Sequence, residues 1–86
     1  MNINDLIAII KKKLQNNIVI EKLDIEDKSF LHKNHLNHQE GKFHLKIKIK
    51  SLELKKLNRV ESNKRIYKVL NQELKEYIHS LQILII

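Results

Sequence analysis

The chain has 86 residues, enough for one small domain with a modest hydrophobic core. Hydrophobic residues make up 42% of the sequence, so a folded domain is expected rather than a disordered chain. There is no cysteine, which excludes disulfides, a thiol nucleophile and thiolate metal ligands, and no apolar run approaches the ~20 residues that span a bilayer.

The formal net charge is +7, and it comes from 15 lysines and only 2 arginines set against 10 acidic residues. A basic protein attracts nucleic acid, anionic lipid and acidic partners through long-range fields. Proteins that read base sequence favour arginine, however, because it makes bidentate contacts to guanine. The charge therefore indicates no particular function. With no proline and a single glycine, Gly41, the sequence shows no linker, and residues 1–86 are predicted to form a single domain.

The N-terminal third predicts a helix followed by a strand. Asn4 can cap the helix, and Asn16 and Asn17 are expected to end it. Apolar residues recur at helical spacing over this stretch, namely Ile3, Leu6, Ile7, Ile10 and Leu14. From Ile18 to Glu26 the pattern changes toward alternation with β-branched residues, which is typical of a strand.

The clearest pattern is "FHLKIKIKS", which follows a polar loop, "DKSFLHKNHLNHQEGK". Strict alternation predicts a strand with a buried face made of Phe43, Leu45, Ile47 and Ile49. The opposite face is predicted to be wet and cationic, made of His44, Lys46, Lys48 and Lys50. This face is interpreted as solvated, with a docking surface for an acidic partner as the alternative.

The segment from Leu57 to Tyr77 is predicted to be helical, and "LNQEL" is consistent with a break between two helices. Tyr67 and Tyr77 are interpreted as aromatic residues of the core or its edge. The expected apolar set of this segment is Val60, Ile66, Val69, Leu70, Leu74 and Tyr77. From His79 to Ile85 the sequence alternates again, and its apolar face comprises Leu81, Ile83 and Ile85.

The resulting order, α-β-β-α-α-β, predicts an α+β fold in which helices cover one face of a three-stranded mixed sheet. The helical connection is long enough for a crossover, so the last strand is expected to lie parallel to the second. No arrangement of residues indicates catalysis. The carboxylates are scattered among lysines, the serines lack a nucleophile elbow, and there is no glycine-rich phosphate loop. The protein is therefore predicted not to be an enzyme.

Histidines are the residues with the most chemical potential. Four of the five fall between His32 and His44, and "HKNHLNH" spaces His32, His35 and His38 three apart. Neutral imidazole binds zinc, copper, nickel and iron, so this loop is a candidate metal clasp, with solvated histidines as the alternative. His79 heads an apolar segment. It is either a structural histidine with its ring hydrogen-bonded to the preceding loop, or a metal ligand at the edge of the sheet.

Four segments together resemble the BolA-like protein family. "DKSFLHKNH" is similar to its aspartate-serine-histidine signature, and "HLKIKIKS" with Leu54 is similar to its histidine–aromatic strand. "RIYKVLNQEL" resembles the family's helix and "IHSLQI" its usual ending, so that the match runs from about Leu23 to Ile83. The family's arginine-histidine-arginine triplet appears here as Ser62, Asn63 and Lys64.

The resemblance implies a fold related to class II KH domains, which matches the order of elements derived above. KH domains grip nucleic acid through a GXXG loop, which a chain with one glycine cannot form. Members of the family pair with monothiol glutaredoxins around a shared 2Fe–2S cluster, in iron–sulfur trafficking and iron regulation. The resemblance therefore implies a non-enzymatic adaptor that is monomeric alone and forms a heterodimer with a glutaredoxin.

The resemblance implies that His79 occupies the position of the family's C-terminal cluster ligand. It also implies a second ligand from the loop, where His35 occupies the matching position and His32 and His38 are alternates. Histidines can replace cysteines on one iron of a 2Fe–2S cluster, as in Rieske centres. Because this chain has no thiol, the partner would bring the sulfur ligands, with glutathione supplied on the partner's side.

The family also implies an alternative, a DNA-binding transcriptional regulator acting in stress responses, with Lys64 and Arg65 as the candidate contacts. The scarce arginines and the missing GXXG weigh against it. No membrane association is expected. The expected location is the cytoplasm, or the mitochondrial matrix if a targeting segment was removed. Family members often continue with more strand or a final helix, so the ending "ILII" is consistent with a truncated C-terminus.

Overall fold

In the computed structural model, which describes residues 1–29 and 42–86, helices and strands follow the predicted order with one short helix added. The elements are α1 (Ile3–Asn17), β1 (Lys22–Asp27), β2 (Phe43–Lys50), α2 (Leu52–Lys55), α3 (Arg59–Val69), α4 (Asn71–Glu76) and β3 (Ile78–Ile85). The added helix is α2, which makes little more than one turn and is too short for periodicity to reveal.

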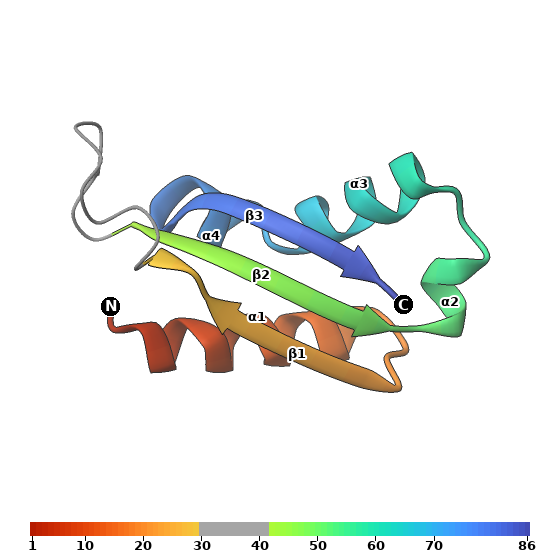
Figure 1. Ribbon diagram of the computed structural model, residues 1–86, viewed down its shortest axis with the longest axis horizontal. Coiled ribbons are helices and arrows are strands. Elements are labelled where there is room, and N and C mark those ends of the chain that lie inside the picture. Colours follow the sequence, from red (N-terminus) through yellow and green to blue (C-terminus); the bar gives the residue numbers. More distant parts are fainter. Residues whose placement is uncertain (30–41) are drawn as a thin grey trace.

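The strands form one sheet in the order β1-β2-β3, so β2 is central (Figure 1). β1 runs antiparallel to β2, and β2 runs parallel to β3. The connection between the two parallel strands consists of α2, α3 and α4, in agreement with the rule that parallel strands need a crossover. The predicted three-stranded mixed sheet is therefore confirmed.

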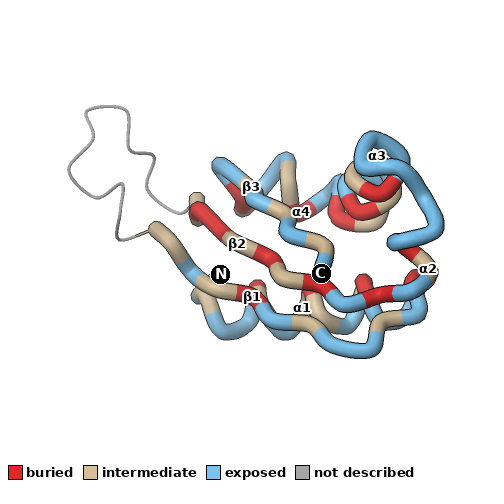
Figure 2. The backbone as a smooth tube through the Cα atoms, turned by 45° about the vertical axis from the view of Figure 1, so that its right-hand side comes forward, coloured by how far each residue is buried: buried red, intermediate tan, exposed pale blue. Residues whose placement is uncertain are grey.

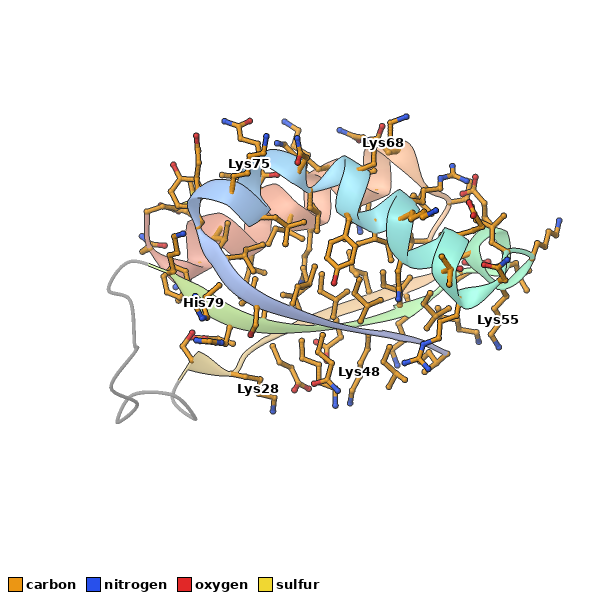
Figure 3. The ribbon with its side chains drawn as sticks, turned by 90° about the horizontal axis from the view of Figure 1, so that it is seen from above. Lys28, Lys48, Lys55, Lys68, Lys75 and His79 are labelled. Carbon is orange, nitrogen blue, oxygen red and sulfur yellow. The ribbon has the colours of Figure 1, made fainter. Side chains whose placement is uncertain are left out.

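The longer helices lie on one face of the sheet, and among the described residues no element covers the other face (Figure 1, Figure 3). Figure 2 shows buried positions along β2 and recurring along the helices. The buried hydrophobic residues are Leu6, Ile10, Leu14, Ile18, Ile25, Leu45, Ile47, Ile49, Leu54, Ile66, Leu70 and Ile78. Burying each such side chain contributes about 1.5–3 kcal/mol, so the space between sheet and helices is where the fold is stabilised.

The first helix begins earlier than the sequence predicts. Its cap is Asn2, whose Oδ1 accepts a hydrogen bond of 2.8 Å from the N–H of Asp5, so the prediction of Asn4 as the cap is wrong. A capping side chain must precede the first helical residue to reach the free N–H groups, and Asn4 already lies inside the first turn. Leu6 and Leu14 are fully buried, which confirms the apolar face of the helix.

The first strand begins at Lys22, later than the predicted start at Ile18. Ile18 instead closes α1, because its N–H donates to the carbonyl of Leu14 at 2.9 Å while its side chain enters the core. Pairing with β2 is preceded by a hydrogen bond of 2.8 Å from the N–H of Glu21 to the carbonyl of Lys50. The apolar run before β1 is therefore a connecting segment and not part of the strand. Its first residue, Ile18, packs into the core.

The third helix begins at Arg59 rather than at Leu57, because Asn58 caps it. The Oδ1 of Asn58 accepts from the N–H of Glu61 at 2.8 Å. Ser62 is buried one turn into the helix, and its hydroxyl contacts the carbonyl oxygen of Asn58 at 2.9 Å. The hydroxyl also lies 3.0 Å from a carbonyl oxygen of α2, so this serine joins the two helices.

The predicted break near "LNQEL" is confirmed, since α3 ends at Val69 and α4 begins at Asn71. The prediction that Val60 and Tyr67 belong to the core or its edge is wrong. Val60 is 61% exposed and Tyr67 is 42% exposed. Tyr77 is half-buried and packs against the core, as predicted for a residue at its edge.

The open face of the sheet carries both positively and negatively charged side chains. In the antiparallel register Asp24 stands opposite Lys48 and Glu26 opposite Lys46, so acidic residues of β1 share the face with the lysines of β2. Glu26 also accepts a hydrogen bond from Lys28 at 2.9 Å, and this bond with the nearby positive charge lowers the pKa of the Glu26 carboxyl. The lysines of β2 thus form the cationic strand face that alternation predicts, and the register places acidic residues of β1 beside them.

Candidate metal-ligand site

His79 lies where α4 passes into β3, at one end of the sheet (Figure 3). The N–H of Tyr77 donates to the carbonyl of Glu73 at 2.8 Å and closes the last turn of α4. The carbonyl of Tyr77 then accepts from the N–H of Phe43 at 2.9 Å, which ties the junction to β2. The side chain of His79 is exposed. The junction thus presents an imidazole to solvent from a backbone held on both sides.

An irregularity in the register decides where His79 lies relative to the sheet. Two consecutive residues of β2 pair with Ile78 and Ser80, so His79 is an extra residue without a register partner, as in a β-bulge. Because of this extra residue, Ile78 and Leu81 both pack toward the core although they are three positions apart. Strict alternation would instead put His79 on the same face as Leu81.

The ring of His79 packs against the ring of His44. The two centroids are 4.8 Å apart and the planes meet at 62°, an edge-to-face arrangement. The Nδ1 atom of His44 shares a hydrogen bond of 2.6 Å with the hydroxyl oxygen of Ser80. Alternation predicts a solvated His44, but this residue is only 7% exposed, so that prediction is wrong. His44 is a residue of this site that the sequence pattern did not indicate.

Backbone contacts fix the position of His44. Its N–H donates to the hydroxyl oxygen of Ser29 at 3.0 Å, and its carbonyl accepts from the N–H of Lys28 at 2.7 Å. The N–H of Ser29 in turn donates to a carboxylate oxygen of Asp27 at 2.9 Å. The aspartate and serine of the quoted signature therefore hold the end of β1 against the start of β2, directly beside the histidine pair.

The chemical capacity of this site is nitrogen donation. An exposed, neutral imidazole is a good ligand for iron, zinc or copper, and its neighbour restricts the orientations that the ring can take. Within residues 1–29 and 42–86 there is no group of three or more histidine, cysteine, aspartate or glutamate side chains placed to hold a metal ion. The predicted loop ligand His35 and its alternates His32 and His38 lie outside the described residues.

The two candidate nucleic-acid contacts lie on α3, away from His79. Lys64 is exposed. Arg65 donates to the carbonyl of Asn17 at 3.2 Å and to a carboxylate oxygen of Glu53 at 2.8 Å, so its guanidinium joins α1, α2 and α3. The pKa of Glu53 is lowered, first by a hydrogen bond from the N–H of Val19 and then by Arg65. Arg65 thus has a structural role besides any ligand contact.

Residues 14–86 match the family model described as "BolA-like protein". The chain belongs to this family. A relative from Haemophilus influenzae, named "DNA-binding transcriptional regulator BolA", is 38% identical over 73 residues, which are 85% of this chain and 68% of that protein. The family assignment predicted from the four quoted segments is therefore confirmed.

Solved structures of this family share the fold. The BolA domain of SufE1 from Arabidopsis thaliana matches with a TM-score of 0.78 at 26% identity, covering 99% of this chain and 92% of that chain. BolA1 from Arabidopsis thaliana matches with a TM-score of 0.76 at 28% identity, covering 91% and 86%. Within the described residues, no helix is both long and apolar enough to cross a bilayer.

Proposed function

We propose that this BolA-like protein is a non-enzymatic adaptor that binds a monothiol glutaredoxin and completes a shared 2Fe–2S cluster with histidine nitrogens. The observation that carries the proposal is the exposed imidazole of His79, supported by the ring of His44 and presented from a fixed strand end. A ligand of this kind needs no movement of the core to reach a cluster held by another protein.

The composition of the chain supports a cluster site shared with a partner protein over a site formed by this chain alone. A 2Fe–2S cluster is commonly held by thiolates, and histidines can replace the cysteines of one iron. Because this chain has no thiol, the partner would have to supply the sulfur ligands. His79 is the first proposed nitrogen donor. His35 is the proposed second donor, with His32 and His38 as alternates.

Reconstitution tests the proposal. The full chain is mixed with a monothiol glutaredoxin, iron, sulfide and glutathione, and the complex is followed by visible absorption and circular dichroism. The expected result is a coloured one-to-one heterocomplex whose bands change or disappear with His79→Ala. Gln82→Ala is the matched control, because Gln82 is also an exposed polar residue of β3. Far-UV circular dichroism of the free variants checks that both remain folded.

The second ligand is tested in the same assay with His35→Ala, His32→Ala and His38→Ala. The proposal expects the largest spectral change with His35→Ala. A heterocomplex of His79→Ala with an unchanged spectrum would show that His79 is not a ligand. Failure of the wild-type chain to bind a monothiol glutaredoxin, with or without a cluster, would exclude the adaptor role itself.

A second candidate function is DNA binding. It is supported by the name of the Haemophilus influenzae relative and by the helices, which carry nine basic and five acidic residues. DNA titrations at several salt concentrations test it. A steep salt dependence without sequence preference would mean attraction by charge alone, whereas a sequence preference that Lys64→Gln or Arg65→Gln weakens would support a regulator.

A further inference from the structure

We propose that a groove between α1 and α3 binds ligands that carry linked phosphate groups, such as a nucleoside triphosphate or a short polyphosphate. The groove has a volume of about 750 Å³, within the roughly 300–1,000 Å³ typical of small-molecule sites. Four cationic side chains and one carboxylate line it. These are Lys13, Lys64, Arg65, Lys68 and Glu61. The proposal is independent of the adaptor role.

Two of the cations are held in place by the fold. Lys13 forms an ion pair with the buried carboxylate of Glu73, with 2.5 Å between Nζ and Oε2. One terminal nitrogen of Arg65 is held by Asn17 and Glu53. These contacts reduce the ordering that binding would require, and they leave other N–H donors of both side chains for a ligand.

The other two cations are not neutralised within the described part of the chain. Lys64 and Lys68 are exposed, and among residues 1–29 and 42–86 neither forms an ion pair. Residues four apart on a helix are neighbours, with about 5–6 Å between their Cβ atoms, so the two ammonium groups repel each other. An anion placed between them removes this repulsion.

The weakness of single surface ion pairs indicates a ligand with several charges. One exposed pair changes an affinity by less than about fivefold, so a lone carboxylate or phosphate gains little here. Linked phosphates place several negative charges within the short span that these side chains cover. Leu57 and Val69 also line the groove, one near each end of α3, and each offers an apolar contact for a nucleobase. A nucleotide and an inorganic chain share the phosphates, and the base distinguishes them.

The groove is separate from the histidine pair. Figure 3 shows Lys68 on the helical side of the molecule and His79 at the end of the sheet where β3 begins. Arg65 links the last turn of α1 to α2, at the end of the helical layer opposite the junction that carries His79 (Figure 1). Occupation of the groove therefore leaves the His79 surface accessible.

Nuclear magnetic resonance titration of the isotope-labelled full chain tests the proposal, with inorganic tripolyphosphate and, separately, ATP as probes at low salt. The expected shifts concentrate in the C-terminal half of α1 and in α3. Lys64→Gln/Lys68→Gln is expected to weaken binding about tenfold, since two surface pairs are lost. Glu61→Gln is expected to strengthen binding about twofold, because it removes the carboxylate of the lining.

The matched control is Lys22→Gln/Lys50→Gln, which removes the same charge from exposed positions on the sheet and should change the affinity less than about twofold. Tighter binding of ATP than of tripolyphosphate would identify a nucleotide, and equal binding an inorganic chain. Equal weakening by both double variants, shifts spread over the sheet, or no saturable binding would overturn the proposal. So would a single-stranded oligonucleotide that binds more tightly than ATP and shifts residues beyond the groove.

Discussion

Replacement of Lys13 by methionine is expected to destabilise the protein more than replacement of its partner Glu73 by glutamine. The Nζ of Lys13 and Oε2 of Glu73 join α1 to α4 at 2.5 Å. The side chain of Glu73 is only 5% exposed, whereas that of Lys13 is 36% exposed. Among the described residues, Oε1 of Glu73 has no hydrogen-bond partner. Lys13→Met leaves this buried carboxylate without a counter-charge, whereas Glu73→Gln leaves a lysine that can turn toward water.

The exposure of the two side chains sets the magnitude. Removal of one partner from a fully buried pair costs about 3–5 kcal/mol, and water already screens this pair on its lysine side. We therefore expect a loss of roughly 1.5–3 kcal/mol for Lys13→Met and about 1 kcal/mol for Glu73→Gln. In a domain of this size each 1 kcal/mol lowers the Tm by about 4–8 °C.

Urea unfolding followed by far-UV circular dichroism measures these differences, with Lys12→Met as the control because Lys12 is exposed on the same helix. The double variant Lys13→Met/Glu73→Leu is expected to recover much of the loss, since no unpaired charge remains buried. The reasoning is refuted if Lys13→Met is no more destabilising than Lys12→Met, or if the order of the two single variants is reversed.

Three further predictions concern single residues. Ile47→Ala empties a fully buried position of the central strand and should cost roughly 3–4 kcal/mol in urea unfolding; a loss below about 1 kcal/mol would contradict the packing. Ser51→Ala removes the cap of α2 and a hydrogen bond of 2.7 Å to the carbonyl of Val19. The loss of stability in urea unfolding should be about 1–2 kcal/mol, and an unchanged unfolding midpoint would contradict this prediction. The pKa of Glu53 is lowered in the folded state, so its contribution to stability is present above its ordinary value of 4.5 and is lost as the pH falls through the folded-state value. Glu53→Gln should therefore flatten the acid limb of stability against pH, and an unaltered limb would refute this assignment.

Local patterns predicted most of the fold because each depends on residues close together in the chain. The alternation around Ile47 and Ile49 identified the central strand, and helical spacing identified α1 and α3. The boundaries that failed depend on individual hydrogen bonds, such as the cap from Asn2 to Asp5. Several residues near each boundary could make such a bond, so composition alone does not select among them. The mixed charge of the open sheet face was missed for a related reason, because it depends on the register between β1 and β2.

The site was predictable only in part, because its two histidines are brought together by the pairing of β2 with β3. His79 was identified by family resemblance. His44 was not identified as a residue of the site, because 35 positions separate the two histidines in the chain. In the fold their rings are in contact. The predicted loop ligands at positions 32, 35 and 38 lie outside the described residues, so their assignment stays a prediction. Long-range pairing of this kind leaves no periodic signal, since each strand pattern is satisfied in more than one register.

One signal for the bulge is nevertheless present in the sequence. The apolar residues of the last segment are first three apart, from Ile78 to Leu81, and only then two apart. Both side chains pack toward the core, and a regular strand cannot turn residues three apart to the same face. An extra residue is therefore required between them, and the two candidates are His79 and Ser80, which are both polar. The apolar spacing that stabilises the core thus also forces the imidazole out of it, so exposure of His79 follows from packing and does not depend on a bound metal.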